Sequence, residues 1–282
     1  MITHQSESQA TQIVESSTPR LGRIARQLLV ASLLANAVVC ALAAYIVYRR
    51  GGTEYLEKRF SGNILSPARV HWIRRQSLFQ RLQSVPERPA HPIVFLGDSI
   101  TELGEWDEIV GGRGAIVNRG IGADTSRGVL DRIETSAAMR PRAVFLMIGT
   151  NDASFLQPKE TVQNCRLIVE RIGTESPSTM VYVQSVLPTG GPWQSRNAWI
   201  RDVNAGLKAM ADGTRVVYID LYQSFLDKGT LNAKLSFDGV HLNGDGYDLW
   251  YNLLLPLVRS QLAVASPSVH PPRPASAGAP LR

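Results

Sequence analysis

Cysteine is scarce in this sequence of 282 residues, which contains only Cys40 and Cys165. Two cysteines are too few for a disulfide-based scaffold or a cysteine-rich metal site. Cys40 lies in an apolar segment and Cys165 on a predicted helix, so we expect no disulfide between them. No HExxH, P-loop or GxGxxG motif occurs either. We therefore expect no metal and no cofactor.

A general excess of positive charge is also absent, because the net charge of +6 is concentrated in one segment. Residues 49–92 contain nine Lys and Arg against three Asp and Glu, whereas residues 93–282 contain eighteen against nineteen. A protein that binds nucleic acid broadly needs a basic face on its folded domain. We therefore expect no nucleic-acid partner for the nearly neutral region.

Long apolar runs are rare, and one without any charge spans residues 28–48. Its 21 residues form about 31 Å of helix, enough to cross a hydrocarbon core of about 30 Å. A cleaved signal peptide is the alternative, because Ala41-Leu42-Ala43 supplies an A-x-A pattern. The apolar run continues through Tyr48, and the polar segment before it, residues 1–27, is long. We therefore predict a disordered tail followed by a retained transmembrane anchor.

Two further segments are interpreted from composition. Residues 49–92 form a basic connector, and the apolar positions between residues 68 and 85 have the spacing of an amphipathic helix. The arginines of this helix could lie on anionic lipid headgroups, or the helix could pack on the following domain with its arginines in solvent. Residues 264–282 are rich in Pro, Ala and Ser, which predicts a flexible tail.

From residue 93 the chain alternates apolar strands with amphipathic helices, as is typical of a parallel sheet with helices on both faces. The predicted strands are residues 93–96, 115–118, 143–148, 180–185 and 215–219. Helices are predicted to begin near Ser99, Thr125, Pro158, Arg196 and Gly244. We therefore predict a three-layer α/β/α sandwich over residues 93–263, with a five-stranded parallel sheet in the flavodoxin-like order 2-1-3-4-5.

Four polar motifs stand in or near the turns of this predicted fold: GDS (97–99), NRGIGADTS (118–126), GTND (149–152) and DGVH (238–241). A hydroxyl just past the carboxyl end of a central strand stands where open α/β sheets bind ligands, which singles out Ser99. Asp98 and Ser99 could instead simply cap the next helix.

The four motifs, in this order, resemble the blocks of the SGNH hydrolases, also called GDSL esterases and lipases, over residues 93–258. NRGIGADTS and GTND are most similar to the platelet-activating-factor acetylhydrolase small-subunit type and its bacterial relatives. The resemblance implies a serine hydrolase that cleaves carboxylic esters through an acyl-serine intermediate.

A serine hydroxyl needs a base to become a good nucleophile, and the sequence contains five histidines. Four of them lie in predicted tails, in the connector or at the opposite end of the first strand: His4, His71, His91 and His270. His241 remains, with Asp238 three residues before it to orient the imidazole. We therefore predict Ser99, Asp238 and His241 as the catalytic residues.

An acyl-transfer site also needs donors for the developing oxyanion. The first and third strands are neighbours in the predicted order, so we expect the Asn151 side-chain amide and the Ser99 backbone N–H to be donors. The resemblance implies a third donor, the backbone N–H of a glycine, and Ala123 occupies that position. This departure is tolerated if φ is negative and is unfavourable if the turn needs a positive φ.

The loop after the fourth strand lines the pocket in the resembled family, which implies a substrate contact for Trp193. Trp193 could equally pack beneath its own loop. No lid or long apolar insertion separates the motifs, which favours short acyl groups.

We therefore predict a membrane-anchored serine esterase that acts on a small-molecule, glycan or lipid ester. An O-acyltransferase to a cell-envelope saccharide would use the same residues, and a catalytically silent interaction protein would keep only the fold. The basic residues on the two sides of the anchor nearly balance, so they do not orient it. By the resemblance, we expect a bacterial inner-membrane protein with its catalytic domain in the periplasm.

Overall fold

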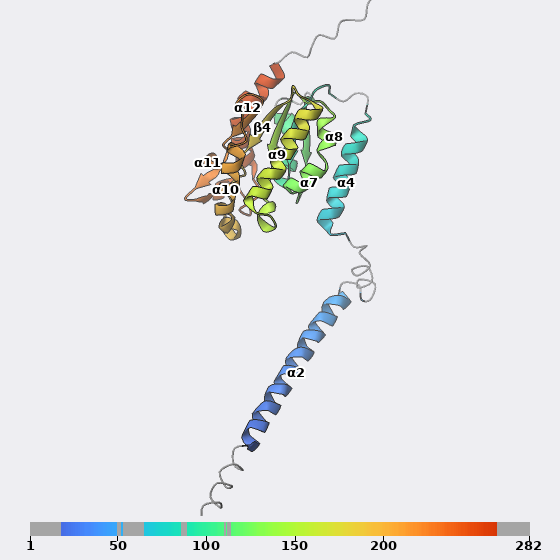
Figure 1. Ribbon diagram of the computed structural model, residues 1–282, viewed down its shortest axis with the longest axis vertical. Helices are drawn as coiled ribbons and strands as arrows, with labels where there is room; N and C mark the ends of the chain where they lie inside the picture. Colours follow the sequence, from blue (N-terminus) through green and yellow to red (C-terminus); the bar gives the residue numbers. More distant parts are fainter. Residues whose placement is uncertain are drawn as a thin grey trace, which may run out of the picture. The chain divides into compact units, whose positions relative to one another are not determined.

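The computed structural model describes residues 18–49, 52, 65–85, 89–109, 111 and 114–263. The chain divides into two compact units, the first ending at Leu65 and the second beginning at Ser66. Helix α2 belongs to the first unit, and the sheet and the helices from α4 onward belong to the second (Figure 1). The predicted tail 264–282 and residues 1–17 of the predicted tail 1–27 lie outside the described residues.

Helix α2 (Thr18–Arg49) begins ten positions before the predicted anchor, within the segment predicted as a tail. Pro19 occupies a position that tolerates proline at a helix start, and most residues after it are good helix formers. Once the apolar run is helical, each added residue extends the helix at little cost. The stretch Ala25–Arg49 is long and apolar enough to cross a membrane. By length and composition it could be a membrane anchor or a signal sequence.

The second unit is built around a parallel sheet in the order β2-β1-β3-β4-β5, as predicted. The strands are β1 (Ile93–Gly97), β2 (Ile116–Gly120), β3 (Ala143–Met147), β4 (Met180–Gln184) and β5 (Val216–Ile219). Each strand agrees with its predicted range to within two residues. Strands β1 and β3 are buried along their whole length, because helices cover both faces of the sheet.

Two hydrophobic layers hold the helices on the sheet. One face, with Val94 and Leu146, packs against α7 (Ser126–Asp131), α8 (Ile133–Ala137), α9 (Pro158–Glu175) and α10 (Asn197–Lys208). The other face packs against α5 (Ser99–Glu102), α6 (Trp106–Ile109) and α12 (Gly244–Ala263). Short elements complete the unit: α11 (Tyr222–Phe225), the ribbon β6 (Leu226–Asp227) and β7 (Thr230–Leu231), and the 3₁₀ turns η1 (Asp152–Ser154), η2 (Gly191–Arg196) and η3 (Ala233–Leu235).

An aromatic column fills the second layer. Phe95 stacks on Trp106 with ring centroids 4.1 Å apart and on Phe145 at 4.9 Å, and Phe145 stacks on Tyr182 at 4.6 Å. Trp250 of α12 meets the Trp106 ring edge-on at 4.6 Å. Each such pair contributes roughly 0.5–1.5 kcal/mol beyond the burial of its area. The column connects three central strands to the C-terminal helix and so makes the sheet a rigid support for its loops.

Helix α4 (Pro67–Leu82) also belongs to the second unit, which begins at Ser66, whereas the predicted domain begins at residue 93. Phe79 is only 2% exposed, and the Gln83 side chain donates a hydrogen bond to the Thr135 carbonyl at 2.9 Å. Arg74 and Arg81 remain exposed. In the structure, α4 therefore packs on the second unit, with Arg74 and Arg81 in solvent.

Candidate active site

Ser99 stands at the carboxyl end of β1, where it begins helix α5. A side chain at Gly97 would collide with the Thr101 hydroxyl, so this close approach of strand and helix requires glycine. Asp98 caps α5, because its carboxylate accepts a hydrogen bond from the Ile100 N–H at 3.0 Å. The tight turn from strand to helix therefore presents the Ser99 hydroxyl at the edge of the sheet.

His241 and Asp238 form a hydrogen-bonded line with Ser99, although 142 positions separate the serine from the histidine. The Oγ of Ser99 lies 3.0 Å from Nε2 of His241. Nδ1 of His241 lies 2.7 Å from Oδ2 of Asp238. The structure thus brings together the three residues predicted as catalytic, in the arrangement that a serine nucleophile and its base require.

The loop between η3 and α12 carries Asp238 and His241 in a fixed conformation. Oδ1 of Asp238 accepts hydrogen bonds from the backbone N–H groups of Val240 at 2.9 Å and His241 at 2.8 Å. Gly239 has a φ of +82°, and a Cβ there would collide with the carbonyl of Gly190. The Gly190 N–H also donates to the Gly239 carbonyl at 2.8 Å, which fixes this loop against the loop after β4.

The same contacts keep Asp238 ionised. Partial burial alone would raise the pKa of Asp238, but hydrogen bonds from the His241 side chain, the His241 N–H and the Val240 N–H outweigh it and hold the pKa at about 2. A charged Asp238 accepts the Nδ1–H of His241 and leaves Nε2 to face the Ser99 hydroxyl. The carboxylate therefore selects the imidazole tautomer that can take a proton from serine.

Asn151 follows β3, the neighbour of β1 in the sheet, and therefore lies at the same edge as Ser99. Its Nδ2 donates a hydrogen bond to the backbone carbonyl of Asp124 at 2.8 Å. Among the described residues, this is the one hydrogen bond that the Asn151 side chain makes. Because an amide nitrogen carries two N–H groups, the second can point to a ligand oxygen.

Ala123 has a φ of +61°, in the left-handed region. The sequence allowed either a negative or a positive φ at this position, and the structure has the positive φ, which is unfavourable for alanine. The left-handed conformation costs a residue with a Cβ roughly 1–2 kcal/mol. Ala123 immediately precedes Asp124, whose carbonyl accepts the Asn151 hydrogen bond. The strained residue therefore belongs to the same turn as the partner of Asn151.

Replacing Ala123 by glycine is expected to raise the free energy of unfolding by up to about 1 kcal/mol. Glycine adopts positive φ without strain, although it adds conformational entropy to the unfolded chain. The kcat for ester hydrolysis should stay within about twofold, because the backbone N–H is retained. Chemical denaturation and steady-state kinetics measure the two effects. A large fall in kcat would show that the Ala123 methyl group itself is needed.

Asp98 is a buried carboxyl group next to Ser99, with 1% of its surface exposed. Burial raises its pKa to about 7, and the hydrogen bond from the Ile100 N–H offsets this only in part. Between about pH 4 and pH 7 the folded protein therefore binds more protons at this site than the unfolded chain does. The contribution of Asp98 to stability consequently becomes less favourable as the pH rises through this window.

Replacing Asp98 by asparagine keeps an oxygen that can cap α5 but removes the titration. The free energy of unfolding of this variant, relative to the unmodified protein, should rise from about pH 4 to about pH 7 and stay level above that. Denaturant titrations at several pH values measure the difference. A difference that does not change with pH would contradict the burial effect on the Asp98 pKa.

Buried ionic groups behind the site were not predicted from the sequence. Arg132 Nε lies 2.8 Å from Oδ2 of Asp124, with side chains 0% and 2% exposed, and its Nη2 donates to the Gly97 carbonyl at 3.1 Å. The carboxylate of Asp152 accepts the Ser126 N–H at 3.0 Å. Asp124 stands in the motif NRGIGADTS and Asp152 in GTND, and each motif follows a buried strand. This position was the signal in the sequence that could have indicated their burial.

Asn118 is a second residue whose role the sequence did not show. Its Nδ2 lies 3.1 Å from the Thr101 carbonyl and 3.0 Å from the carbonyls of Glu102 and Gly104. Its Oδ1 accepts the Gly120 N–H at 2.8 Å. Asn118 therefore holds the C-terminal end of α5 against the end of β2.

Trp193, the predicted substrate contact, lies on η2 and is 40% exposed rather than packed beneath its loop. The Arg196 guanidinium lies 4.5 Å from the centre of its ring and donates to the Ser154 hydroxyl at 2.9 Å. Within the described residues, no hydrogen bond or ring contact joins Trp193 to Ser99 or His241. The side chain is accessible to a ligand but is not part of the hydrogen-bonded line.

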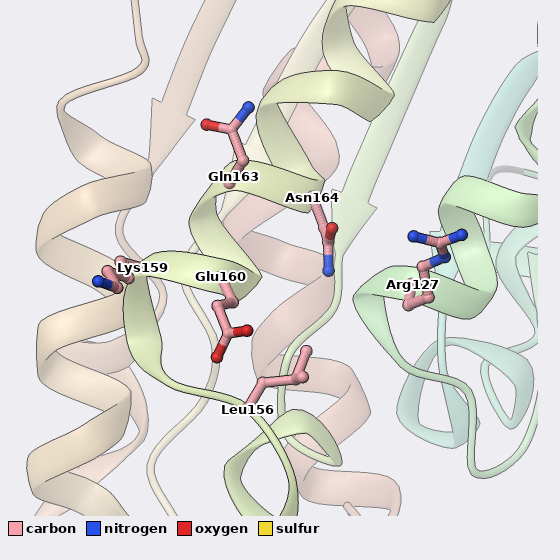
Figure 2. A pocket seen from close by; sticks show the side chains of 6 residues that line it. All are labelled: Arg127, Leu156, Lys159, Glu160, Gln163 and Asn164. Carbon is pink, nitrogen blue, oxygen red and sulfur yellow. The ribbon is translucent and has the colours of Figure 1, made fainter.

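An open groove of about 620 Å³ lies between α7 and α9 (Figure 2). It is lined by Arg127, Leu156, Lys159, Glu160, Gln163 and Asn164, none of which is a predicted site residue. Three of its polar side chains have partners elsewhere. Arg127 pairs with Asp131, Glu160 accepts the Gln157 N–H, and Asn164 donates to the Ser126 hydroxyl. These contacts stabilise α7 and α9, and we assign the candidate site to the edge that holds Ser99.

Residues 95–249, more than half of the chain, match the model of the GDSL-like Lipase/Acylhydrolase family. The chain therefore belongs to this family. The matched range runs from β1 into α12 and includes Ser99, Ala123, Asn151, Asp238 and His241. Family membership identifies the protein as an ester hydrolase.

Two solved structures illustrate the likeness. A candidate acylhydrolase from Bacteroides fragilis is 26% identical, with a TM-score of 0.59 over 71% of this chain and 100% of that chain. A GDSL-like lipase from Bacteroides thetaiotaomicron is 25% identical, with a TM-score of 0.57 over 66% of this chain and 97% of that chain.

A curated relative, the N-acylneuraminate cytidylyltransferase of Escherichia coli O18:K1:H7, is 28% identical over 120 residues. The matched segment is 41% of this chain but only 28% of the relative. The chain thus spans little more than a quarter of the length of this relative.

Proposed function

We propose that this ester hydrolase acts through an acyl-serine intermediate, with Ser99 as nucleophile. His241 Nε2 takes the hydroxyl proton while Oγ forms a bond to the ester carbonyl carbon. The negative charge moves to the carbonyl oxygen, where N–H groups of Ser99, Asn151 and Ala123 stabilise it. The intermediate collapses, the bond to the alcohol oxygen breaks, and protonated His241 returns its proton to that oxygen.

The second half of the reaction repeats these steps with water. His241 takes a proton from a water molecule as its oxygen attacks the acyl carbon, and it then protonates Ser99 Oγ as the carboxylic acid leaves. Asp238 remains charged throughout, since its pKa is held at about 2, and stabilises the imidazolium. The continuous line from Ser99 Oγ through His241 to Asp238, with spacings of 3.0 and 2.7 Å, is the observation that carries this proposal.

Covalent labelling by a fluorophosphonate probe tests this mechanism. The probe reacts with an activated serine, so mass spectrometry should find the adduct on Ser99 of the full chain. A protein that hydrolyses esters but carries the adduct on another serine would refute the assignment. A folded protein with neither labelling nor hydrolysis would instead be the silent interaction protein.

We further propose that the acyl group is short and that a saccharide is the alcohol part of the ester. The absence of a lid or long insertion between the sequence motifs supports a short acyl group. The relative from Escherichia coli is named for an N-acylated sugar acid, which supports a saccharide. A panel of p-nitrophenyl esters of increasing chain length, with O-acetylated saccharides beside it, tests both points. Preference for long chains would refute the first, and acyl transfer to an added saccharide in place of water would indicate an acyltransferase.

We also propose that α2 anchors the protein in a bacterial inner membrane with the catalytic unit in the periplasm. The 25 residues Ala25–Arg49 would form about 37 Å of helix, more than a hydrocarbon core of about 30 Å requires. Protease added to intact spheroplasts should then digest the catalytic unit. Protection until lysis would put the unit in the cytoplasm. A mature chain that begins within or after residues 28–48 would identify α2 as a signal sequence.

A further inference from the structure

Helix α4 lies outside the range matched by the family model, yet its N-terminal half contacts the turn that contains one proposed oxyanion donor, Ala123, and the carbonyl that binds another, Asn151. This turn, residues 120–124, connects β2 to α7 and is called the glycine turn below. Three α4 side chains, those of His71, Trp72 and Arg75, reach the glycine turn directly or through Glu102. These contacts concern the site itself, because the glycine turn contains Ala123 and the carbonyl that binds Asn151.

Trp72 acts on the glycine turn through Asp124. Its indole N–H donates to Oδ1 of Asp124 at 3.1 Å, and the Thr125 N–H donates to the same oxygen at 3.0 Å. The Nε–H of Arg132 donates to the other carboxylate oxygen, Oδ2, at 2.8 Å. Three donors therefore fix the Asp124 side chain, and the carbonyl of the same residue accepts the Asn151 amide at 2.8 Å. The orientation of the Asn151 amide thus depends on a residue that Trp72 holds.

His71 and Arg75 act on the glycine turn through Glu102, the last residue of α5. Nε2 of His71 lies 2.9 Å from Oε2 of Glu102, and Arg75 Nε lies 2.8 Å from Oε1. The same carboxylate accepts the N–H of Gly122 at 2.6 Å. Gly122 immediately precedes Ala123 and Asp124 immediately follows it, so Glu102 holds the residue before Ala123.

The two sets of contacts enclose the strained residue. Ala123, at a φ of +61°, lies between Gly122, which Glu102 holds, and Asp124, which Trp72 holds. A residue in a sparsely populated conformation persists only where its surroundings over-determine it. The contacts from α4 supply part of this constraint on both sides of the proposed oxyanion donor.

Further contacts fasten α4 to the domain away from the glycine turn. Phe79, 2% exposed, lies against the guanidinium groups of Arg75 at 4.7 Å and Arg119 at 4.6 Å. The Gln83 side chain binds the Thr135 carbonyl near the other end of the helix at 2.9 Å. Burial of Phe79 and this hydrogen bond fasten the C-terminal half of α4, whereas the N-terminal half contacts the glycine turn.

We infer that α4 is a positioning element of the oxyanion hole, in which Trp72 acts through Asp124 and His71 and Arg75 act through Glu102. The inference rests on the proposed roles of Asn151 and Ala123. It makes a helix outside the family model a determinant of kcat rather than a mere connection to α2.

Trp72→Phe in the full chain tests this inference, because phenylalanine keeps an aromatic ring and removes the N–H. The kcat should fall about fivefold, as expected for one lost hydrogen bond, with KM within twofold. Gln83→Ala is the matched control, since Gln83 directly follows α4 and its side chain makes a hydrogen bond of similar length away from the glycine turn. Its kcat should stay unchanged. An equal fall in both variants would show that α4 only stabilises the fold and would overturn the inference.

A double-mutant cycle with Asn151→Ala gives a readout that a purely structural role would not change. If Trp72 acts through Asn151, Trp72→Phe should lower kcat by less than about twofold once Asn151 is alanine. An equal fall in both backgrounds would overturn the inference. If Trp72→Phe does not fold, His71→Gln decides in its place, because the His71 side chain is 44% exposed. Its kcat should then fall about two- to fivefold, and an unchanged kcat would overturn the inference.

The same measurements separate this inference from the proposed function. A large loss of kcat in Asn151→Ala, with Trp72→Phe and His71→Gln like the unmodified protein, would leave the mechanism standing and reject only the role of α4. Full activity of Asn151→Ala would reject the proposed oxyanion hole itself.

Discussion

Ester hydrolysis is expected to disappear when Ser99 is replaced by alanine, with a fall in kcat of about 10⁶. The substitution removes the Oγ that lies 3.0 Å from Nε2 of His241, and no covalent intermediate can form without it. Alanine is smaller and a good helix former, so α5 and the sheet should remain folded. Steady-state kinetics with a p-nitrophenyl ester measure the loss, and circular dichroism with membrane fractionation checks folding and attachment.

His241→Ala provides the companion measurement for Ser99. Because Ser99 and His241 act as a unit, the double variant should be little worse than Ser99→Ala alone. If the loss of activity in the double variant equalled the combined losses of two large, independent effects, His241 would not activate Ser99. Substantial hydrolysis remaining in Ser99→Ala would place the nucleophile elsewhere in the chain and reject the proposed mechanism.

Asn151→Ala is expected to lower kcat by about 10²–10³ with a smaller change in KM. The amide donates one N–H to the Asp124 carbonyl at 2.8 Å, and the second is proposed to bind the oxyanion, whose charge is greatest in the transition state. Loss of a donor to that charge removes stabilisation from the transition state and much less from the bound ester.

Asn164→Ala is the matched control for Asn151. Asn164 also presents a half-buried side-chain amide near this edge of the sheet, but it donates to the Ser126 hydroxyl at 2.9 Å. Its kcat should stay within a few-fold of the unmodified protein. A change in KM alone for Asn151→Ala would show that Asn151 binds the ground-state ester and would remove it from the oxyanion hole.

The sequence alone sufficed to predict the sheet, because its strands are apolar runs that end at glycine or polar residues. Buried parallel strands must be apolar on both faces, so β1 and β3 can be recognised from their own sequences without knowing which strands they pair with. The rules of α/β topology then restrict the strand order to a few possibilities, of which 2-1-3-4-5 was predicted and found. The juxtaposition of Ser99, Asp238 and His241 was also predictable, since few histidines compete and each motif stands near the same edge.

Tertiary structure alone decided how the site is supported. The indole of Trp72 meets Asp124 across 52 positions of sequence, and His71 meets Glu102 across 31. Local patterns describe a helix, but they do not identify which distant carboxylate its polar side chains will bind. Likewise, an alanine in a motif does not reveal its φ, because the surrounding contacts determine whether the turn holds Ala123 at +61°. Local apolar patterning therefore sufficed to predict the sheet. Contacts between polar groups far apart in the sequence, which local patterns do not specify, join α4 to the glycine turn in the second unit.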